Sequence, residues 1–170
     1  MANTIQDTLK LLCNWYDEPS TGNERPKLIS KLALLELCGW IEGTFDEIIL
    51  EVNKSTINDQ KWVLELLGKT SGFTYASHLR PMLICLIGEI FTRKFESEME
   101  KNNPGDLERL ILLLSTLWKK RCQFAHADIV GNISSQAQFD SPSWSNNQYR
   151  ILNKLIENLR KNILTILKTV

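Results

Sequence analysis

The sequence predicts an all-α protein, a single-domain antiparallel bundle of five to six helices. Apolar residues recur at helical spacing along nearly the whole chain, and glycine or proline marks most of the segment ends. The alternation of apolar and polar residues that is typical of a strand is absent, apart from a short hairpin that residues 128–139 would allow. A chain of 170 residues, 43% hydrophobic and 24% charged, is long enough to bury one core. We therefore expect one helical domain over residues 1–170.

The first part of the chain supplies two of these helices. Residues 4–16 carry apolar side chains three and four positions apart, which predicts an amphipathic helix. Two prolines and a glycine make residues 17–26 a loop. Residues 27–52 are apolar nearly all round, as is typical of the central helix of a bundle.

The rest of the chain continues this pattern. Further helices are expected at residues 58–67, 79–101, about 104–127 and about 145–169. The first of them should end at Gly68, and Pro81 fits the first turn of the second. Residues 128–143 are rich in Ser, Gln, Asn and Gly and lack a helical period, so they form a long loop. Loops of this length are often functional.

Composition excludes several classes of protein. The longest apolar run, residues 82–91, is interrupted by Gly88 and Glu89 and is shorter than the roughly 18–20 residues of a membrane span. The N-terminus lacks the pattern of a signal peptide, so we expect a cytoplasmic protein without a membrane partner. The four cysteines form no Cys-x-x-Cys pair, which indicates four buried thiols and neither a zinc site nor a disulfide framework. No metal or other cofactor is expected. The net charge is zero, so any contact with nucleic acid must be local or supplied partly by another protein.

Arg121 interrupts the apolar stripe of the helix expected at residues 104–127. A guanidinium buried there needs an acidic partner or a phosphate, because an unpaired buried charge costs several kcal/mol. His126 follows five residues later, about 140° further round the helix. The two side chains can act on one substrate only if something completes the groove between them. A second copy of the chain, related by a twofold axis, would complete it.

The long apolar helix expected at residues 27–52 contains two acidic residues whose charge is opposite to that of Arg121. Glu36 and Glu42 fall inside its apolar stretch, and a buried carboxylate needs a cation. Arg121 is the natural candidate, with Glu42 preferred over Glu36 as its partner. Gly39 and Gly43 lie four residues apart, which would let a neighbouring helix come close.

Two short segments carry a family resemblance. Arg-Cys-Gln-Phe-Ala-His at 121–126 resembles the Arg-x4-6-His motif of the HEPN superfamily (higher eukaryotes and prokaryotes nucleotide-binding), and Trp-Ile-Glu-Gly at 40–43 is similar to the Trp-Glu-Gly-type segment of its ribonuclease-like members. The resemblance implies a homodimer whose two motifs face each other across a cleft. It also implies metal-independent RNA cleavage in a toxin–antitoxin or phage-defence system.

The chain departs from the family pattern at two positions. Many catalytic members carry Asn, Asp or His directly after the Arg, where this chain has Cys122. Members that an antitoxin nucleotidyltransferase modifies carry Tyr two residues after the His, where this chain has Asp128. The second departure argues against regulation by adenylylation of a tyrosine.

These residues allow a mechanism in which the 2′-hydroxyl of RNA attacks the adjacent phosphorus, giving a 2′,3′-cyclic phosphate and a 5′-hydroxyl. His126 would transfer a proton, since imidazole has an ordinary pKa of about 6.5. Arg121, held by Glu42, would bind the phosphate and stabilise its extra negative charge. The expected substrate-binding residues around them are Lys119, Lys120, Cys122 and Gln123.

Each of these residues also has a structural explanation. His126 would serve equally as a residue that contacts the last carbonyls of its helix. Arg121 and Glu42 would serve equally as a buried ion pair. The alternative function is a non-catalytic HEPN-like module that dimerises or binds a nucleotide or a protein. The expected partners are RNA and a second copy of the chain, with an antitoxin protein as a further one.

Overall fold

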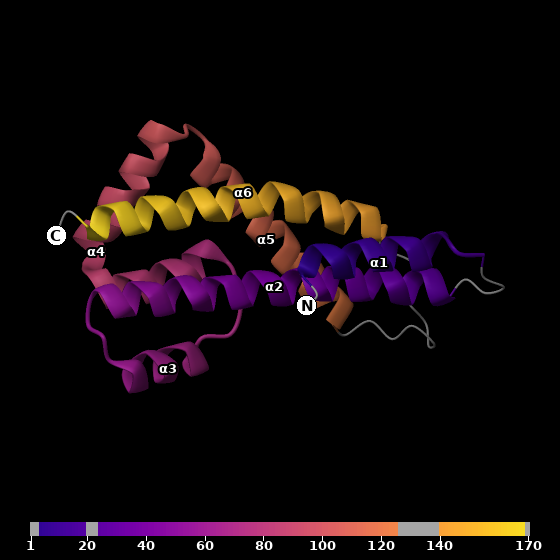
Figure 1. Cartoon of the computed structure of the whole chain (residues 1–170), viewed down its shortest axis with the longest axis horizontal. Coiled ribbons are helices and arrows are strands. Elements are labelled where there is room, and N and C mark those ends of the chain that lie inside the picture. Colours follow the sequence, from indigo (N-terminus) through magenta and orange to yellow (C-terminus); the bar gives the residue numbers. More distant parts are fainter. Residues whose placement is uncertain (1–3, 20–23, 126–139, 169–170) are drawn as a thin grey trace. The chain divides into compact units, whose positions relative to one another are not determined.

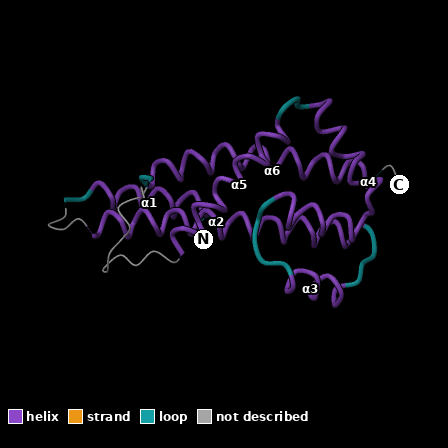
Figure 2. The backbone as a smooth tube through the Cα atoms, turned by 180° about the vertical axis from the view of Figure 1, so that it is seen from behind, coloured by secondary structure: helices purple, strands orange, loops and turns teal. Residues whose placement is uncertain are grey.

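The computed structural model describes residues 4–19, 24–125 and 140–168, and this part of the chain is all-α, as predicted (Figure 1). Its elements are α1 (Ile5–Asp17), α2 (Glu24–Ser55), α3 (Gln60–Lys69), the π-helical turn η1 (Tyr75–Leu79), α4 (Arg80–Asn102), α5 (Asp106–Ala125) and α6 (Pro142–Leu167). Loops lie on both sides of α3, between α2 and η1 (Figure 2). The hairpin considered at residues 128–139 lies outside the described residues.

The chain divides into two compact units. Unit 1 comprises Met1–Trp40 and Leu117–Ile151, and unit 2 comprises Ile41–Thr116 and Leu152–Val170. Three helices, α2, α5 and α6, contribute residues to both units. That the whole chain is one domain stays a prediction.

Unit 1 is built on the pairing of α1 with the first half of α2. A capping box starts α1: Thr4 Oγ1 accepts a hydrogen bond from the Asp7 backbone N–H, and the Asp7 carboxylate accepts one from the Thr4 N–H, both at 3.3 Å. A buried cluster then joins the two helices through Leu9, Leu12, Ile29 and Ala33, with Ile5 and Tyr149 packed against it. Burying a leucine side chain contributes about 1.5–3 kcal/mol, so this cluster fixes the hairpin.

A charged cluster spans a break in α4 within unit 2. Gly88 has φ +78° and ψ 162°, so the helix is interrupted there. The Arg80 guanidinium donates to Glu89 and to Glu96, each at 2.8 Å, and the Tyr75 hydroxyl donates to Glu96 at 2.7 Å. These contacts join η1 to both halves of α4 across the break. The long helix predicted for residues 79–101 is present, with a break at Gly88 that the prediction did not include.

Three predicted helix boundaries also differ from the structure. α2 begins at Glu24 rather than Lys27, because Pro26 fits the first helical turn, where its missing N–H is not needed. α3 continues through Gly68 to Lys69 instead of ending there. α6 begins at Pro142, so the predicted loop is shorter at its C-terminal end.

The predictions for cysteine burial and for membrane spans have different outcomes. Only Cys38 is buried, whereas Cys13 is half-buried and Cys85 and Cys122 are exposed. The prediction that all four thiols are buried is therefore wrong. Apolar periodicity had assigned them to helix interiors, but exposed helix faces accept a small thiol as well. Within the described residues, no helix combines the length and the apolar character that crossing a bilayer requires.

Candidate functional site

The candidate site begins with Arg121, close to the C-terminal end of α5. Arg121 is half-buried, and its guanidinium carbon lies 5.1 Å from the centroid of the Trp118 ring. The two residues are three positions apart, a spacing that brings side chains together on a helix surface. A guanidinium over an indole face gains about 0.5–2 kcal/mol, so the ring restricts where Arg121 can point.

The expectation that Arg121 is deeply buried is therefore wrong. Leu117 and Phe124 are buried on the same stripe of α5, whereas Arg121 between them keeps part of its surface in solvent. A long arginine side chain is able to bury its aliphatic stem while part of it stays in solvent, so its helical position alone does not require full burial. The half-buried Arg121 is thus partly hydrated, and its pairing with an acid stays a prediction.

The two predicted acidic partners differ in exposure. Glu36 is exposed, so the prediction that its carboxylate is buried is wrong. Glu42 is half-buried and lies one helical turn before Asp46, an exposed residue whose pKa is raised by partial desolvation and, to a lesser extent, by the negative charge of Glu42. Glu42 belongs to unit 2 and Arg121 to unit 1, and their pairing stays a prediction.

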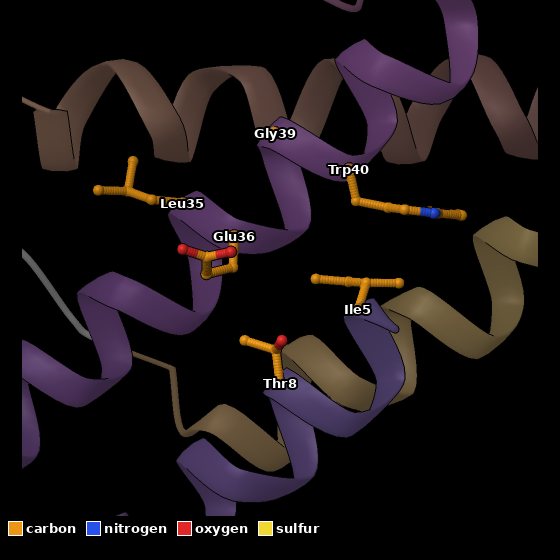
Figure 3. Close-up of a pocket in the computed structure, with 6 residues that line it drawn as sticks. All are labelled: Ile5, Thr8, Leu35, Glu36, Gly39 and Trp40. Carbon is orange, nitrogen blue, oxygen red and sulfur yellow. The ribbon is translucent and has the colours of Figure 1, made fainter. Parts of the chain in front are cut away.

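Gly39 and Gly43 do not mark a close helix contact within the described part of the chain. A Cβ added to either residue would have no heavy atom within 4 Å, so the predicted approach of a neighbouring helix is wrong for this chain alone. Gly39 instead borders an open hollow of about 350 Å³ (Figure 3). Figure 3 shows Ile5 and Thr8 on α1 opposite the α2 residues that complete its lining, namely Leu35, Glu36, Gly39 and Trp40.

The residues expected to bind substrate divide into two groups. Lys119, Cys122 and Gln123 are exposed and accessible at the end of α5. Lys120 is half-buried, and its Nζ donates to Asp140 Oδ2 at 2.6 Å. The same ammonium lies 5.2 Å from the centroid of the Trp144 ring. Lys120 therefore ties the end of α5 to the start of α6, and a phosphate would have to compete with Asp140 for it.

Side chains pack tightly around the Lys120–Asp140 ion pair. Phe124, Asp140 and Trp144 meet Ser30 and Leu34 of α2 in a crevice that leaves no room for a water molecule. The end of α5 is thus held on both sides, by α2 and by α6, within unit 1. A rigid helix end is a suitable platform for a residue that has to hold a substrate group in one position.

His126 directly follows α5 and lies outside the described residues, so its place in the site stays a prediction. The structure brings Lys119, Arg121, Cys122 and Gln123 to one helix end. Sequence reasoning missed the stacking of Arg121 on Trp118, although the three-residue spacing was a readable signal. In the described ranges, no three His, Cys, Asp or Glu side chains gather as ligands for a metal ion.

Comparison with protein-family models, with curated proteins and with solved structures gave no match to this chain. The resemblance to the HEPN superfamily therefore rests on the residues at 40–43 and 121–126 alone.

Proposed function

We propose that this chain is a metal-independent endoribonuclease, acting in the cytoplasm as a toxin or phage-defence effector. The observation that carries the proposal is Arg121, a guanidinium held against Trp118 at an accessible helix end, five residues before His126. A planar guanidinium whose direction is already restricted is suited to binding two oxygens of one phosphate.

The proposed reaction needs no bound metal or cofactor. The 2′-hydroxyl oxygen forms a bond to phosphorus while a base takes its proton, the bond from phosphorus to the 5′-oxygen breaks, and an acid protonates that oxygen. In a homodimer with the site at its twofold interface, the His126 side chains of the two copies divide the base and acid roles. Arg121 neutralises the charge that builds up on the phosphoryl oxygens.

The surroundings of Arg121 support a local binding site rather than a broad basic surface. Lys119, Cys122 and Gln123 are exposed on the same helix end as Arg121. Lys120 is already paired with Asp140, so Lys119 is the better candidate to reach a flanking phosphate. A local site of this kind agrees with a net charge of zero.

A second function has one observation in its favour. Arg121 packs on Trp118, and Lys120 binds Asp140, so two of the cations at the site stabilise unit 1 without any substrate. A non-catalytic HEPN-like module that dimerises, or that binds a nucleotide or a protein, would need only this structural role.

Digestion of RNA by the purified protein in the presence of a chelator separates the two functions. We expect His126→Ala and Arg121→Ala each to reduce the cleavage rate by about 100-fold or more. Arg121→Lys keeps the charge but loses the fork of donors and the stacking, so it should also be strongly impaired. Arg109→Ala, an exposed arginine on the same helix, is the matched control and should cleave normally.

Two further measurements complete the experiment. The products should carry 2′,3′-cyclic phosphate ends, and circular dichroism should show that every variant keeps its helical content. If His126→Ala cleaves RNA as fast as the wild type, the catalytic proposal fails and the non-catalytic module is favoured.

A further inference from the structure

The C-terminal part of α6, which belongs to unit 2, carries lysines at a regular spacing. Lys154, Lys161 and Lys168 recur every seven residues, and all three are exposed. Seven residues make about two turns of helix, so each lysine lies about 10.5 Å further along the axis and is turned by about 20° from the one before. Lys168 directly follows α6, and its backbone N–H still donates to the Thr165 carbonyl at 3.3 Å. We call these three residues the lysine stripe.

Carboxylates that contact this part of α6 are paired with residues outside the lysine stripe. Arg160 donates to both carboxylate oxygens of Glu51 on α2, with Nε 2.8 Å from Oε2. Asn158 Nδ2 donates to Asp106 Oδ2 at 2.9 Å. Glu157 lies between the first two lysines, and its Oε1 is 3.9 Å from Arg160 Nη1. In the described part of the chain, the ammonium groups of the lysine stripe form no ion pair.

An open hollow of about 530 Å³ follows the same face of α6. Lys161 and Lys168 line it, with Leu164 and Thr165 between them. Among the described residues, Leu164 is the single apolar side chain in the lining. Protein interfaces bury an apolar core inside a polar rim, and this hollow lacks such a core. Its chemistry therefore favours a ligand that is recognised by charge.

We propose that the lysine stripe binds the phosphate backbone of RNA, as a second contact in addition to the residues around Arg121. The ammonium of a lysine is a compact charge that binds a phosphate without demanding a fixed geometry. Ammonium groups in a row suit a ligand that carries one negative charge in every repeating unit. From Leu152 to Val170 the chain has four cations and one acid, although its net charge is zero. The stripe is thus a local basic site.

An acidic polypeptide is the other linear polyanion that this stripe could attract. Its binding would leave the hollow without the apolar core of a protein interface, so the lining favours RNA. The inference rests on the proposed function for the class of substrate, and it adds a place where RNA is held away from the reacting groups. Contacts of this kind position a nucleic acid and carry no sequence preference.

Fluorescence anisotropy with a 2′-O-methyl oligoribonucleotide tests binding without cleavage, because the blocked 2′-oxygen cannot attack phosphorus. The triple variant Lys154→Gln/Lys161→Gln/Lys168→Gln removes the three charges and keeps good helix formers. The logarithm of the binding constant for a single strand falls with the logarithm of the salt concentration, with a slope of about 0.7 per phosphate contact. The triple variant should therefore reduce this slope by about 2, and Lys161→Gln alone should reduce it by about 0.7. Affinity at about 0.1 M salt should fall by about tenfold or more in the triple variant.

A matched control removes the same charge from elsewhere in unit 2. Lys61, Lys69 and Lys94 are exposed on α3 and α4, and their triple glutamine variant should keep the salt dependence of the wild type. Circular dichroism should show wild-type helical content for both triple variants, since all six side chains are exposed. Binding and cleavage are measured separately. A chain that binds RNA through the lysine stripe but cuts none would overturn the proposed function and leave this inference standing.

Three results would overturn the inference. The first is a wild-type protein that does not bind the oligoribonucleotide at low salt. The second is a folded lysine-stripe variant whose affinity and salt dependence equal those of the control variant. The third is polyglutamate of the same charge that displaces the oligoribonucleotide with equal affinity, which would assign the stripe to an acidic protein.

Discussion

Lys120 has two roles that experiment can separate. As the partner of Asp140 it should affect stability, and as a predicted substrate-binding residue it should affect RNA cleavage. Its ammonium donates to Asp140 at 2.6 Å and lies 5.2 Å from the centroid of the Trp144 ring. Lys120→Met removes the charge but keeps a flexible apolar side chain of similar length. Asp140 then loses its cation while it remains only 29% exposed.

The expected cost follows from the exposure of the pair. Fully exposed ion pairs contribute about 0–1 kcal/mol, whereas hydrogen bonds to charged groups contribute about 1.5–3 kcal/mol. With Lys120 and Asp140 at 27% and 29% exposed, we take about 1 kcal/mol for the pair. The contact with Trp144 adds about 0.5–1 kcal/mol, giving a total of roughly 1.5–2 kcal/mol. In a chain of this size, that lowers Tm by about 3–8 °C.

Urea unfolding followed by circular dichroism measures this cost, and RNA digestion measures the functional effect. Lys119→Met on the neighbouring exposed residue is the control, with an expected change below about 0.5 kcal/mol. Asp140→Asn should destabilise similarly, and the double variant should cost about 1 kcal/mol less than the sum. The reasoning is refuted if Lys120→Met is as stable as the wild type, or if Lys119→Met destabilises equally.

Three further predictions concern backbone strain, alkaline stability and helix capping. Gly72→Ala should destabilise by roughly 1–3 kcal/mol in urea unfolding, because Gly72 has φ +126° and a Cβ there would lie 2.5 Å from the ring of His78. Burial, followed by the hydrogen bond to Glu96, raises the pKa of Tyr75. Its contribution to stability is therefore complete below the ordinary tyrosine pKa of about 10 and is lost as the pH rises above it, at up to about 1.4 kcal/mol per pH unit. Tyr75→Phe should lose less stability between about pH 9 and 11 than the wild type does. Thr4→Ala should cost about 0.5–2 kcal/mol in thermal unfolding, since it removes the cap of α1.

The helices could be predicted from the sequence because their apolar spacing and their end residues agree. The break at Gly88 could not, since side-chain periodicity carries no information on the sign of φ at a glycine. Arg80 before the break binds Glu89 and Glu96 after it, and such contacts between separated residues leave no trace in the apolar spacing. The same limit applies to η1, whose conformation depends on the Tyr75–Glu96 contact.

The candidate site shows why the direction of a side chain is easier to predict than its depth. Periodicity predicted a stripe that runs through Leu110, Leu114 and Leu117 to Arg121 and Cys122. The three leucines are buried, whereas Arg121 is half-buried and Cys122 is exposed. Burial also depends on how far the packing extends along the helix, and the long side chain of Arg121 leaves the interior by lying on Trp118.

Arg121 is half-buried rather than fully buried, and this affects which partners it requires. A fully buried guanidinium would have required an acid, and a pair formed with that acid would have left little reason to bind a phosphate. Arg121 is half-buried with its guanidinium over the Trp118 ring, so part of the residue remains in contact with solvent. A half-buried Arg121 is compatible with pairing to Glu42 and with binding of a phosphate, and both stay predictions.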